Sequence, residues 1–431
     1  MPMVAILLCT HLWLTVRLRV VQRHTVRAVR MSVQKGDSPQ GQISSFGALA
    51  TALAATVGTG NIVGVSAAVA LGGPGAVFWC CLTGVLGMAT KYAEALLACA
   101  YRVCRGGKPE GGPMYVLERG MHSKALALAF AALGAVATFG TGCTVQSHAI
   151  AQSVQEQLGT APLACGVVVT ALSGVVIVLG NKGIAAVCEK LVPGMAALYV
   201  GGCALVLWQA RAFIWPAACL IGREAFRLRA AAGGAVGGGL LLACRYGVSR
   251  GLLSNEAGLG TAPIAAASAG GGDPVRQALV AMTGGLWTSL LCGATGLAIV
   301  SGMLAQPAQF AGAAAEQLTQ RAFSLIPAVG GPVLTLSLCI FAFTSILGWC
   351  YYGEVCVRYL FRGRGTGAYR FLFLSALLAG AALPMDTVWA FTDLMNALMA
   401  LPNLIALWWM QGELCRLSVP LLRFRLTNRL E

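Results

Sequence analysis

The sequence predicts an all-α integral membrane protein with about eleven transmembrane helices. Of its 431 residues, 57% are hydrophobic and only 10% are charged, and the mean hydropathy is +0.75. A soluble domain carries roughly 25% charged residues, so this chain lacks the charge to cover a globule of its size. Most of its surface must face lipid or other apolar helices, which excludes a soluble enzyme, a DNA-binding protein and a disordered chain.

The length of an apolar segment that crosses the bilayer, about 20 residues, defines the predicted helices. The first segment begins almost at Met1, and its length and basic C-terminal flank argue against a cleaved signal peptide. Because this segment is short, a missing upstream piece stays open. The predicted segments are 3–16, 44–71, 76–100, 124–157, 162–180, 184–208, 234–269, 275–302, 327–357, 370–385 and 387–412.

The formal charge of +15 lies mainly in the gaps between these segments. If the gap after the first helix is cytoplasmic, alternation puts about two-thirds of all Lys and Arg on that side, with Arg223, Arg227 and Arg229 as the main exception. Cytoplasmic loops are rich in Lys and Arg. The pattern predicts a multi-pass protein of a cell membrane (a bacterial inner or plasma membrane), with its N-terminus outside and its C-terminus cytoplasmic, and no nucleic-acid partner.

Two predicted helices carry glycines and polar residues about halfway across the bilayer, at Val57–Asn61 and at Ser254–Gly260. Glycine destabilises a helix by about 1 kcal/mol relative to alanine. An interrupted helix survives at that depth only where it lines a cavity within the protein. Close packing of small residues is the alternative, and it suits Gly234, Gly237 and Gly238 better because they lack polar neighbours. We therefore predict a broken helix at both polar runs.

The positions of the breaks predict the internal architecture. Without the short first helix, the broken segments are the first and sixth of ten, which is typical of secondary transporters built from two inverted five-helix repeats. In such folds half-helix N-termini hold a carboxylate and freed carbonyls hold a cation. The predicted parts are an N-terminal helix with a basic cytoplasmic segment (1–36), the first repeat (37–208), an external connection with the second repeat (209–412) and a basic cytoplasmic tail (413–431).

Five long motifs follow one another in order over nearly the whole chain. They are TALAATVGTGNIVGVSAAVALGGPGAVFW (51–79), GGPMYVLERG (111–120), RGLLSNEAGLGTAPIAAASA (250–269), FAFTSILGWCYYGE (341–354) and LMALPNLIALW (398–408). They resemble the signature of the alanine or glycine:cation symporter family. The resemblance implies the five-plus-five repeat fold with an extra first helix, and sodium-driven, sometimes proton-driven, import of small neutral amino acids such as alanine, glycine and serine. A proton-coupled carrier, a carrier of altered specificity and a non-transporting amino-acid sensor of the same fold stay open as alternatives.

The first break is expected to bind the substrate. The N–H groups of Gly58, Thr59 and Gly60 can point at a carboxylate because no bulk blocks the glycines, and the Thr59 hydroxyl can add a bond. Gly60 is expected to hold a backbone angle that only glycine adopts easily. The side-chain oxygen of Asn61 can accept from an ammonium group or from a cation.

Further substrate contacts are expected from the second break and from the third core helix. Ser254, Asn255 and Gly258 belong to the second break, and Gly258 is expected close to the substrate or to the glycines of the first break. Thr141 and Gln146 come from the third core helix. Gln146 resembles the glutamine that the family presents to its substrate, and an interhelical hydrogen bond is the alternative role.

The resemblance also implies a sodium site between the first and eighth core helices. It places there the main-chain carbonyls of Ala54, Val57 and Phe341 and the hydroxyls of Thr344 and Ser345. An all-oxygen site suits sodium, and no transition metal or other cofactor is expected. For the two hydroxyls the alternative is a hydrogen bond back to the previous turn of their own helix.

Glu256 is the only acid at mid-depth in the second broken helix. A buried carboxylate is costly unless it is paired or protonated. Proton coupling and cation binding are its functional alternatives, and we favour a structural role in which it supports the broken helix by accepting hydrogen bonds from freed main-chain N–H groups. Glu94 is expected to form an interfacial pair with Lys91 near a helix end.

Other classes of function find little support. The run Gly58–Gly64 reads GxGxxxG, one residue too long for a dinucleotide motif, and no strand precedes it. The 16 cysteines include no CxxC pair, and the four histidines supply neither a nucleophile–base pair nor a metal cluster. Two single breaks do not make the repeated rings of a channel pore. We therefore predict a carrier and not an enzyme.

Overall fold

The computed structural model describes residues 2–33, 43–105, 108–227, 239–270, 273–383 and 385–419. Over these residues the chain is almost entirely helical, as predicted. The predicted packing glycines Gly234, Gly237 and Gly238 and the basic tail beyond residue 419 lie outside the described residues.

The bundle is built from long apolar helices. Six helical stretches of the described chain are long and apolar enough to cross a membrane, or up to eight if each of two bent helix pairs counts as one span. The long stretches are α5 (Ala76–Ala100), α7 (Lys124–Phe139) continued by the π-helical η3 (Gly140–Thr144) and α8 (Val145–Leu158), α10 (Gly180–Gln209), α14 (Pro274–Ala305), α17 (Gly330–Leu360) and α19 (Met385–Trp409).

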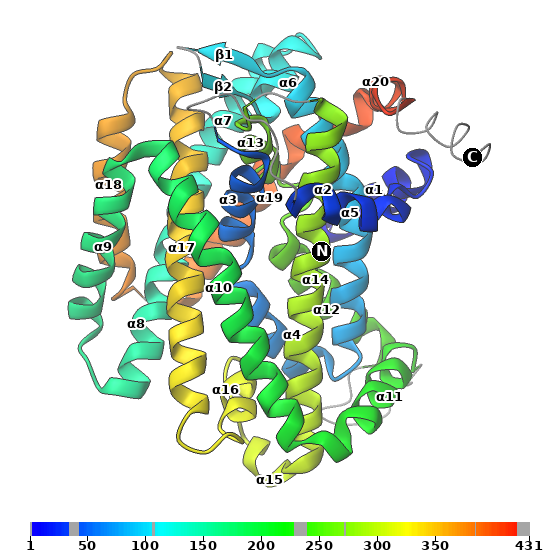
Figure 1. Ribbon diagram of the computed structural model, residues 1–431, viewed down its shortest axis with the longest axis vertical. Coiled ribbons are helices and arrows are strands. Elements are labelled where there is room, and N and C mark those ends of the chain that lie inside the picture. Colours follow the sequence, from blue (N-terminus) through cyan, green and yellow to red (C-terminus); the bar gives the residue numbers. More distant parts are fainter. Residues whose placement is uncertain are drawn as a thin grey trace.

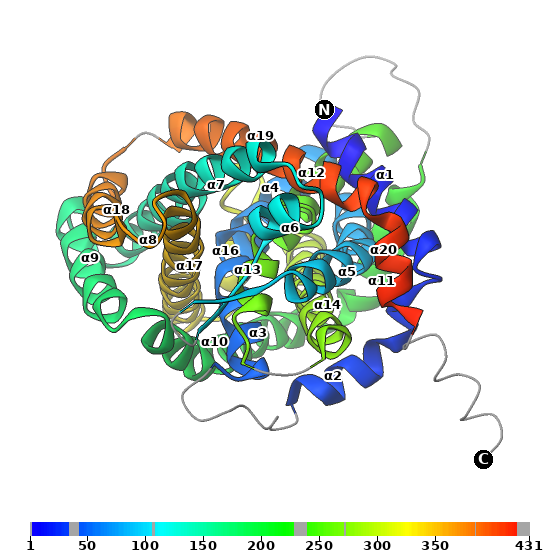
Figure 2. The same cartoon turned by 90° about the horizontal axis from the view of Figure 1, so that it is seen from above.

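Shorter helices complete the bundle. Two of them, α9 (Pro162–Val178) and α18 (Thr366–Gly380), are apolar and pack against each other at one edge (Figure 2). The predicted gap at 181–183 is wrong, because α10 already begins at Gly180, whose φ of +70° makes the turn directly after α9. The interrupted helices are α3 (Ser45–Thr56), η2 (Gly60–Gly64) and α4 (Val65–Gly72), and then α12 (Leu240–Asn255) and α13 (Ala262–Ala267).

The N-terminal segment is a bent pair of helices outside the bundle. α1 (Pro2–Arg17) packs mainly on α5, and the chain then bends by 66° into η1 (Val21–His24) and α2 (Thr25–Val33). Figure 2 shows α1 on the same side of the molecule as α20 (Gln411–Leu417).

Small elements form in the connections, where the sequence predicted none. One end of the bundle carries an antiparallel hairpin of β1 (Val103–Arg105) and β2 (Lys108–Glu110), in which Cys104 faces Pro109, followed by α6 (Pro113–Arg119) (Figure 1). The opposite end carries η4 (Arg211–Phe213), α11 (Ile214–Ala225), α15 (Pro307–Phe310) and α16 (Leu318–Phe323).

The broken helices lie inside the bundle. α3 and α13 are near the centre of the view in Figure 2, with α5 and α14 on one side and α7 and α17 on the other. Close packing around them depends on glycine at tight positions. A Cβ added to Gly142 in η3 would come within 1.9 Å of Cβ of Trp349 on α17, so only glycine fits where these two helices meet.

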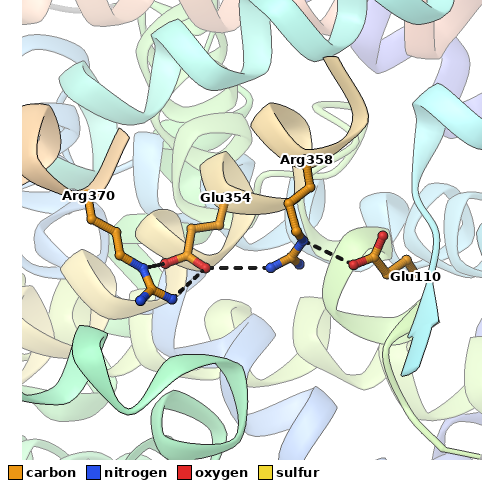
Figure 3. Close-up of polar contacts among 4 residues, drawn as sticks. All are labelled: Glu110, Glu354, Arg358 and Arg370. Atoms are coloured by element: carbon orange, nitrogen blue, oxygen red, sulfur yellow. Dashed lines mark hydrogen bonds and ion pairs between the residues drawn. The ribbon is translucent and has the colours of Figure 1, made fainter. Parts of the chain in front are cut away.

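A row of charges ties the hairpin to two helices at the same end of the bundle (Figure 3). Glu354 on α17 is fully buried and accepts two hydrogen bonds from Arg370 on α18, at 2.6 and 3.1 Å. Arg358 lies 3.6 Å from the other side of Glu354 and 3.0 Å from Glu110 of β2. Two arginines and two glutamates thus neutralise one another where α17, α18 and the hairpin meet.

Candidate functional site

The first predicted break is present between α3 and α4. α3 ends at Thr56, Val57 is extended with φ −84° and ψ 93°, and the halves on either side are bent by 53°. Gly60 opens the π-helical turn η2 and is not among the described residues with positive φ, so the expectation of a special backbone angle there is wrong. The turn is right-handed and any residue can adopt it. Larger residues at these glycine positions are limited instead by the space around them.

The second predicted break separates α12 from α13. Glu256 has a left-handed conformation at φ 53°, and Gly258 and Gly260 have φ of 91° and 81°, which glycine adopts readily. The Glu256 carboxylate accepts a hydrogen bond of 3.0 Å from the hydroxyl of Thr261, just before α13 begins. Glu256 therefore joins the two sides of the break through a side-chain hydroxyl, and not through a main-chain N–H group of the described residues as expected.

Both breaks border one pocket. The first break contributes Gly58, Thr59 and Gly60, and the second contributes Glu256 and Leu259. The remaining lining side chains come from α3, from η3 and α8, from α12 and from α19: Ala55, Thr56, Thr141, Val145, Gln146, Leu253, Trp389, Thr392 and Asn396. The structure thus brings together three predicted residues of the first break, the two of the third core helix, and Glu256: Gly58, Thr59, Gly60, Thr141, Gln146 and Glu256.

Several buried polar atoms at this pocket have no partner among the described residues. Gln146 donates from Nε2 to the main-chain oxygen of Thr141 at 3.0 Å, while its Oε1 accepts nothing. Thr141 donates to Oδ1 of Asn396 at 3.1 Å, which leaves Nδ2 of Asn396 unpaired, and the Thr392 hydroxyl is unpaired too. Because unpaired buried polar atoms are costly, they point to a polar ligand or to water in the pocket.

Thr392 and Asn396 are pocket residues that the sequence analysis missed. They stand four residues apart on α19, a helix that also carries Asp393 and Asn403, and are almost fully buried. Residues at that spacing share one helix face. The sequence signal that could have identified them is the presence of two polar residues on one face of a predicted membrane span.

The other predicted substrate residues do not line the pocket. Asn61 donates to the main-chain oxygen of Thr56 at 3.3 Å and accepts from Cys292 at 3.2 Å. Asn255 lies between α5 and α14, where it donates to the oxygen of Gly84 and accepts from Thr288.

Ser254 and Gly258 are placed differently from each other. The Ser254 hydroxyl has no partner among the described residues, and it would lie 3.2 Å from a Cβ added to Gly60, so Ser254 contacts the first break directly. Gly258 faces away from that break, since a Cβ added there would come within 2.4 Å of Leu7 on α1.

The residues of the predicted cation site are buried between α3 and α17. Ser345 donates to the main-chain oxygen of Ala54 at 3.0 Å, beside the extended Val57. The Thr344 hydroxyl instead donates to the oxygen of Phe341 one turn earlier, at 3.0 Å, and lies 3.4 Å from the sulfur of Met195 on α10. Ser345 thus reaches the broken helix, whereas Thr344 makes the local bond weighed as its alternative.

A second pocket adjoins the first and leads toward α16. The two pockets share Thr59, Val145 and Trp389. Its far side is crossed by a hydrogen bond of 3.2 Å from Gln320 on α16 to Glu156 on α8.

The expected interfacial position of Lys91 and Glu94 is wrong. Both residues are only 3% exposed, and α5 continues beyond them to Ala100. Glu94 accepts a hydrogen bond of 2.6 Å from Asn403 on α19, and Asn403 also donates to the oxygen of Gly258 at 2.9 Å. Packing of α5 against α13 and the neighbouring break buries this stretch, which the local sequence could not reveal.

Two interrupted helices around a buried polar pocket define a membrane transporter. The fold agrees with a solved structure of a Na+-coupled sialic acid symporter in its substrate-bound outward-open state. The TM-score is 0.54 at 12% sequence identity, with 96% of this chain and 85% of that chain covered.

The chain belongs to the sodium:alanine symporter family, whose family model matches residues 1–419. It is 42% identical over 420 residues to the sodium/alanine symporter AgcS of Methanococcus maripaludis, covering 95% of this chain and 92% of that one. It is 46% identical over 413 residues to an uncharacterized transporter of Haemophilus influenzae, covering 94% and 90%. The family consists of transporters and not of enzymes, and the protein is a multi-pass membrane protein of this class.

Proposed function

We propose that this protein imports small neutral amino acids, namely alanine, glycine and serine, in symport with sodium, by alternating access to the pocket between the two breaks. The observation that carries the proposal is the set of unpaired polar atoms at that pocket. This set includes a free hydrogen-bond acceptor, which suits an ammonium group, and free donors, which suit a carboxylate. The similarity to a sodium/alanine symporter supports the choice of substrate and ion.

The ends of an amino acid match these atoms by charge. Oε1 of Gln146 is a free acceptor for the ammonium group. Nδ2 of Asn396, the Thr392 hydroxyl and the N–H groups near Gly58 are donors for the carboxylate. We propose that four other predicted residues support the substrate site by fixing the backbone of the two breaks: Asn61, Ser254, Asn255 and Gly258. We propose Glu256 as the residue that joins the two sides of the second break.

We propose that sodium binds where Ser345 meets α3. Its ligands are the carbonyl oxygens of Ala54, Val57 and Phe341 and the hydroxyls of Ser345 and Thr344. Thr344 must rotate away from Phe341 to take part. A proton-coupled carrier is the second candidate, and it is favoured by the burial of Glu94 and Glu256 near the second break.

We further propose eleven spans in the order of one helix and two inverted five-helix repeats. The six long spans, α1 and the bent pair of α3 with η2 and α4 give eight, and α9, α18 and the interrupted α12–α13 add three. With the N-terminus outside, an epitope tag inserted at Arg364 should be protected from an antibody added to intact cells, and one at Arg223 should be accessible. Recognition of the Arg364 tag from outside would contradict this orientation.

The deciding experiment is uptake by proteoliposomes of labelled alanine, glycine and serine, with and without an inward sodium gradient. We expect uptake to require sodium. Unchanged uptake with choline in place of sodium, in the presence of a proton gradient, would select the proton-coupled candidate. Binding of alanine without any uptake under either gradient would identify a sensor.

A further inference from the structure

A cavity far from the two breaks gathers basic side chains at the turn between α1 and η1. It has a volume of about 320 Å³ and is bordered by α1, η1, α5 and the end of α20. Its basic lining residues are Arg17, Arg19, Arg23, His24 and Arg416. No aspartate or glutamate of the described chain lines it. The positive charge of this cavity attracts an anionic group.

The arginines are held in different ways. Arg23 donates from Nε to His24 at 3.2 Å. Arg416 pairs with Glu413 at 2.7 Å, but its side chain is 76% exposed, so water screens that pair strongly. Arg17 and Arg19 form no ion pair with an acidic residue of the described chain.

The backbone at this turn is strained in a way that places Arg19 in the cavity. Val20 donates its N–H to the oxygen of Thr15 at 2.7 Å and Arg19 donates to Val16 at 3.0 Å, which is the Schellman pattern at the end of α1. The residue at the Arg19 position of that motif has positive φ and is usually glycine. Arg19 and Val20 have φ of 52° and 55°, a conformation that is costly for side chains with a Cβ, most of all for a branched one. An arginine at a glycine position suggests that its side chain is needed.

Exposed apolar residues lie next to the lining residues in the chain, and we take them as the rim of the cavity. Val16 is 73% exposed and Val20 is 51% exposed, and Trp13, further back on α1, is also exposed. A free inorganic anion would not cover these exposed apolar side chains, whereas the acyl chains of a lipid would. In a membrane protein, basic residues immediately after a membrane-embedded helix attract anionic headgroups.

We propose that this cavity binds the phosphate headgroup of an anionic phospholipid, with Arg17 and Arg19 as its main contacts and the exposed valines of α1 against the acyl chains. The bound lipid fixes the bend between α1 and α2, next to α5. This site is separate from the transport pocket and does not depend on the proposed substrate or ion.

The test compares lipid retention by purified full-length protein in detergent. Wild type and variants are incubated with phosphatidylglycerol or phosphatidylcholine, and bound lipid is counted by native mass spectrometry. The informative variant is Arg17→Gln with Arg19→Gly, since glycine suits the backbone at residue 19 and should keep the turn intact. The matched control is Arg364→Gln, an exposed arginine in the turn between α17 and α18.

We expect wild type and the control to retain phosphatidylglycerol in preference to phosphatidylcholine. The double variant should lose roughly 30-fold in phosphatidylglycerol affinity, which corresponds to about 2 kcal/mol. Its melting temperature without lipid should match that of wild type, which separates loss of the site from loss of the fold. Equal retention of phosphatidylglycerol by wild type and the double variant would overturn the proposal.

A third arm distinguishes a lipid from a free anion. Millimolar inorganic phosphate is added to wild type that carries phosphatidylglycerol. The lipid should stay bound, because the apolar rim holds its acyl chains. Complete displacement by phosphate would show that the cavity is a simple anion site and would overturn the assignment to a lipid.

Discussion

Ser345 on α17 donates a hydrogen bond of 3.0 Å to the main-chain oxygen of Ala54, two residues before α3 ends. This is a direct polar link between the unbroken helix α17 and the broken one. A hydroxyl and a carbonyl oxygen that already meet can both turn to a cation that enters between them. The contact therefore places Ser345 better than Thr344 for the proposed sodium site, because the Thr344 hydroxyl is bonded within its own helix.

The first prediction concerns sodium coupling. Ser345→Ala should raise the sodium concentration needed for half-maximal alanine uptake by about ten- to a hundredfold, since losing a hydrogen bond to a charged group costs roughly 1.5–3 kcal/mol. Thr344→Ala should have a smaller effect, and alanine affinity at saturating sodium should change less than sodium affinity. Uptake by proteoliposomes at graded sodium concentrations measures this.

Ser337→Ala is the matched control. Ser337 is a fully buried serine on the same helix, and it bonds back to Val333 at 2.7 Å. If Ser337→Ala and Ser345→Ala shifted the sodium dependence equally, the change would reflect packing of α17, and the sodium site would have to be sought elsewhere.

The second prediction concerns the ends of the substrate. Gln146→Ala removes the free acceptor and Asn396→Ala removes the free donor, so each should weaken alanine binding by about ten- to a hundredfold. Isothermal titration calorimetry with alanine on the purified variants measures the loss. Gln309→Ala, in the short helix α15, is the control because its amide bonds to Ser324 outside the pocket. Normal binding by both pocket variants would mean that the unpaired atoms are satisfied by water and that alanine binds elsewhere.

The sequence predicted the two breaks but only part of the pocket. Val57–Asn61 and Ser254–Gly260 reveal themselves locally, because glycine and polar residues at mid-membrane are costly in any unbroken helix. Thr392 and Asn396 belong to the pocket because α19 packs across η3. Their shared helix face marks them as polar residues within a membrane span, but it does not show which helix they meet.

Side-chain direction is the second part that the sequence could not give. Asn255 is the last residue of α12 and turns to Gly84 and Thr288, while its neighbour Glu256 faces the pocket. The left-handed backbone at Glu256 causes this separation. A pattern of residue types places polar groups at a break, but the exact φ of one residue decides which of them line the cavity.

The third prediction concerns the glycines of the first break. A Cβ at position 58 would lie 2.6 Å from the Ser345 hydroxyl and 3.5 Å from Oε1 of Gln146, whereas one at position 60 would lie 3.2 Å from the Ser254 hydroxyl. Gly58→Ala should therefore abolish detectable alanine binding and weaken sodium binding as well. Gly60→Ala should reduce alanine binding less, because the serine can shift by a few tenths of an ångström.

Gly201→Ala is the control for these variants. Gly201 lies within α10 with no atom within 4 Å of an added Cβ, so alanine should leave binding unchanged and favour the helix slightly. Calorimetry with alanine at high and low sodium separates the two ligands. Equal binding by Gly58→Ala and Gly201→Ala would show that the first break lies away from both sites.

The fourth prediction concerns the charge row at the hairpin end. Glu354 is fully buried between Arg358 and Arg370, so Glu354→Gln leaves Arg370 without its counter-charge, while Arg358 keeps Glu110 (Figure 3). Removing one partner of a buried ion pair costs about 3–5 kcal/mol, and because Arg370 is 29% exposed the loss should lie near the lower value. Thermal unfolding in detergent, followed by tryptophan fluorescence, should show a clear fall in melting temperature.

Glu224→Gln is the comparison, since its partner Arg227 is 43% exposed and such surface pairs contribute about 0–1 kcal/mol. Arg370→Gln should resemble Glu354→Gln only in part, because Arg358 would still neutralise the carboxylate. If Glu354→Gln and Glu224→Gln melted at the same temperature, water would be screening the row fully, and it would not hold α17, α18 and the hairpin together.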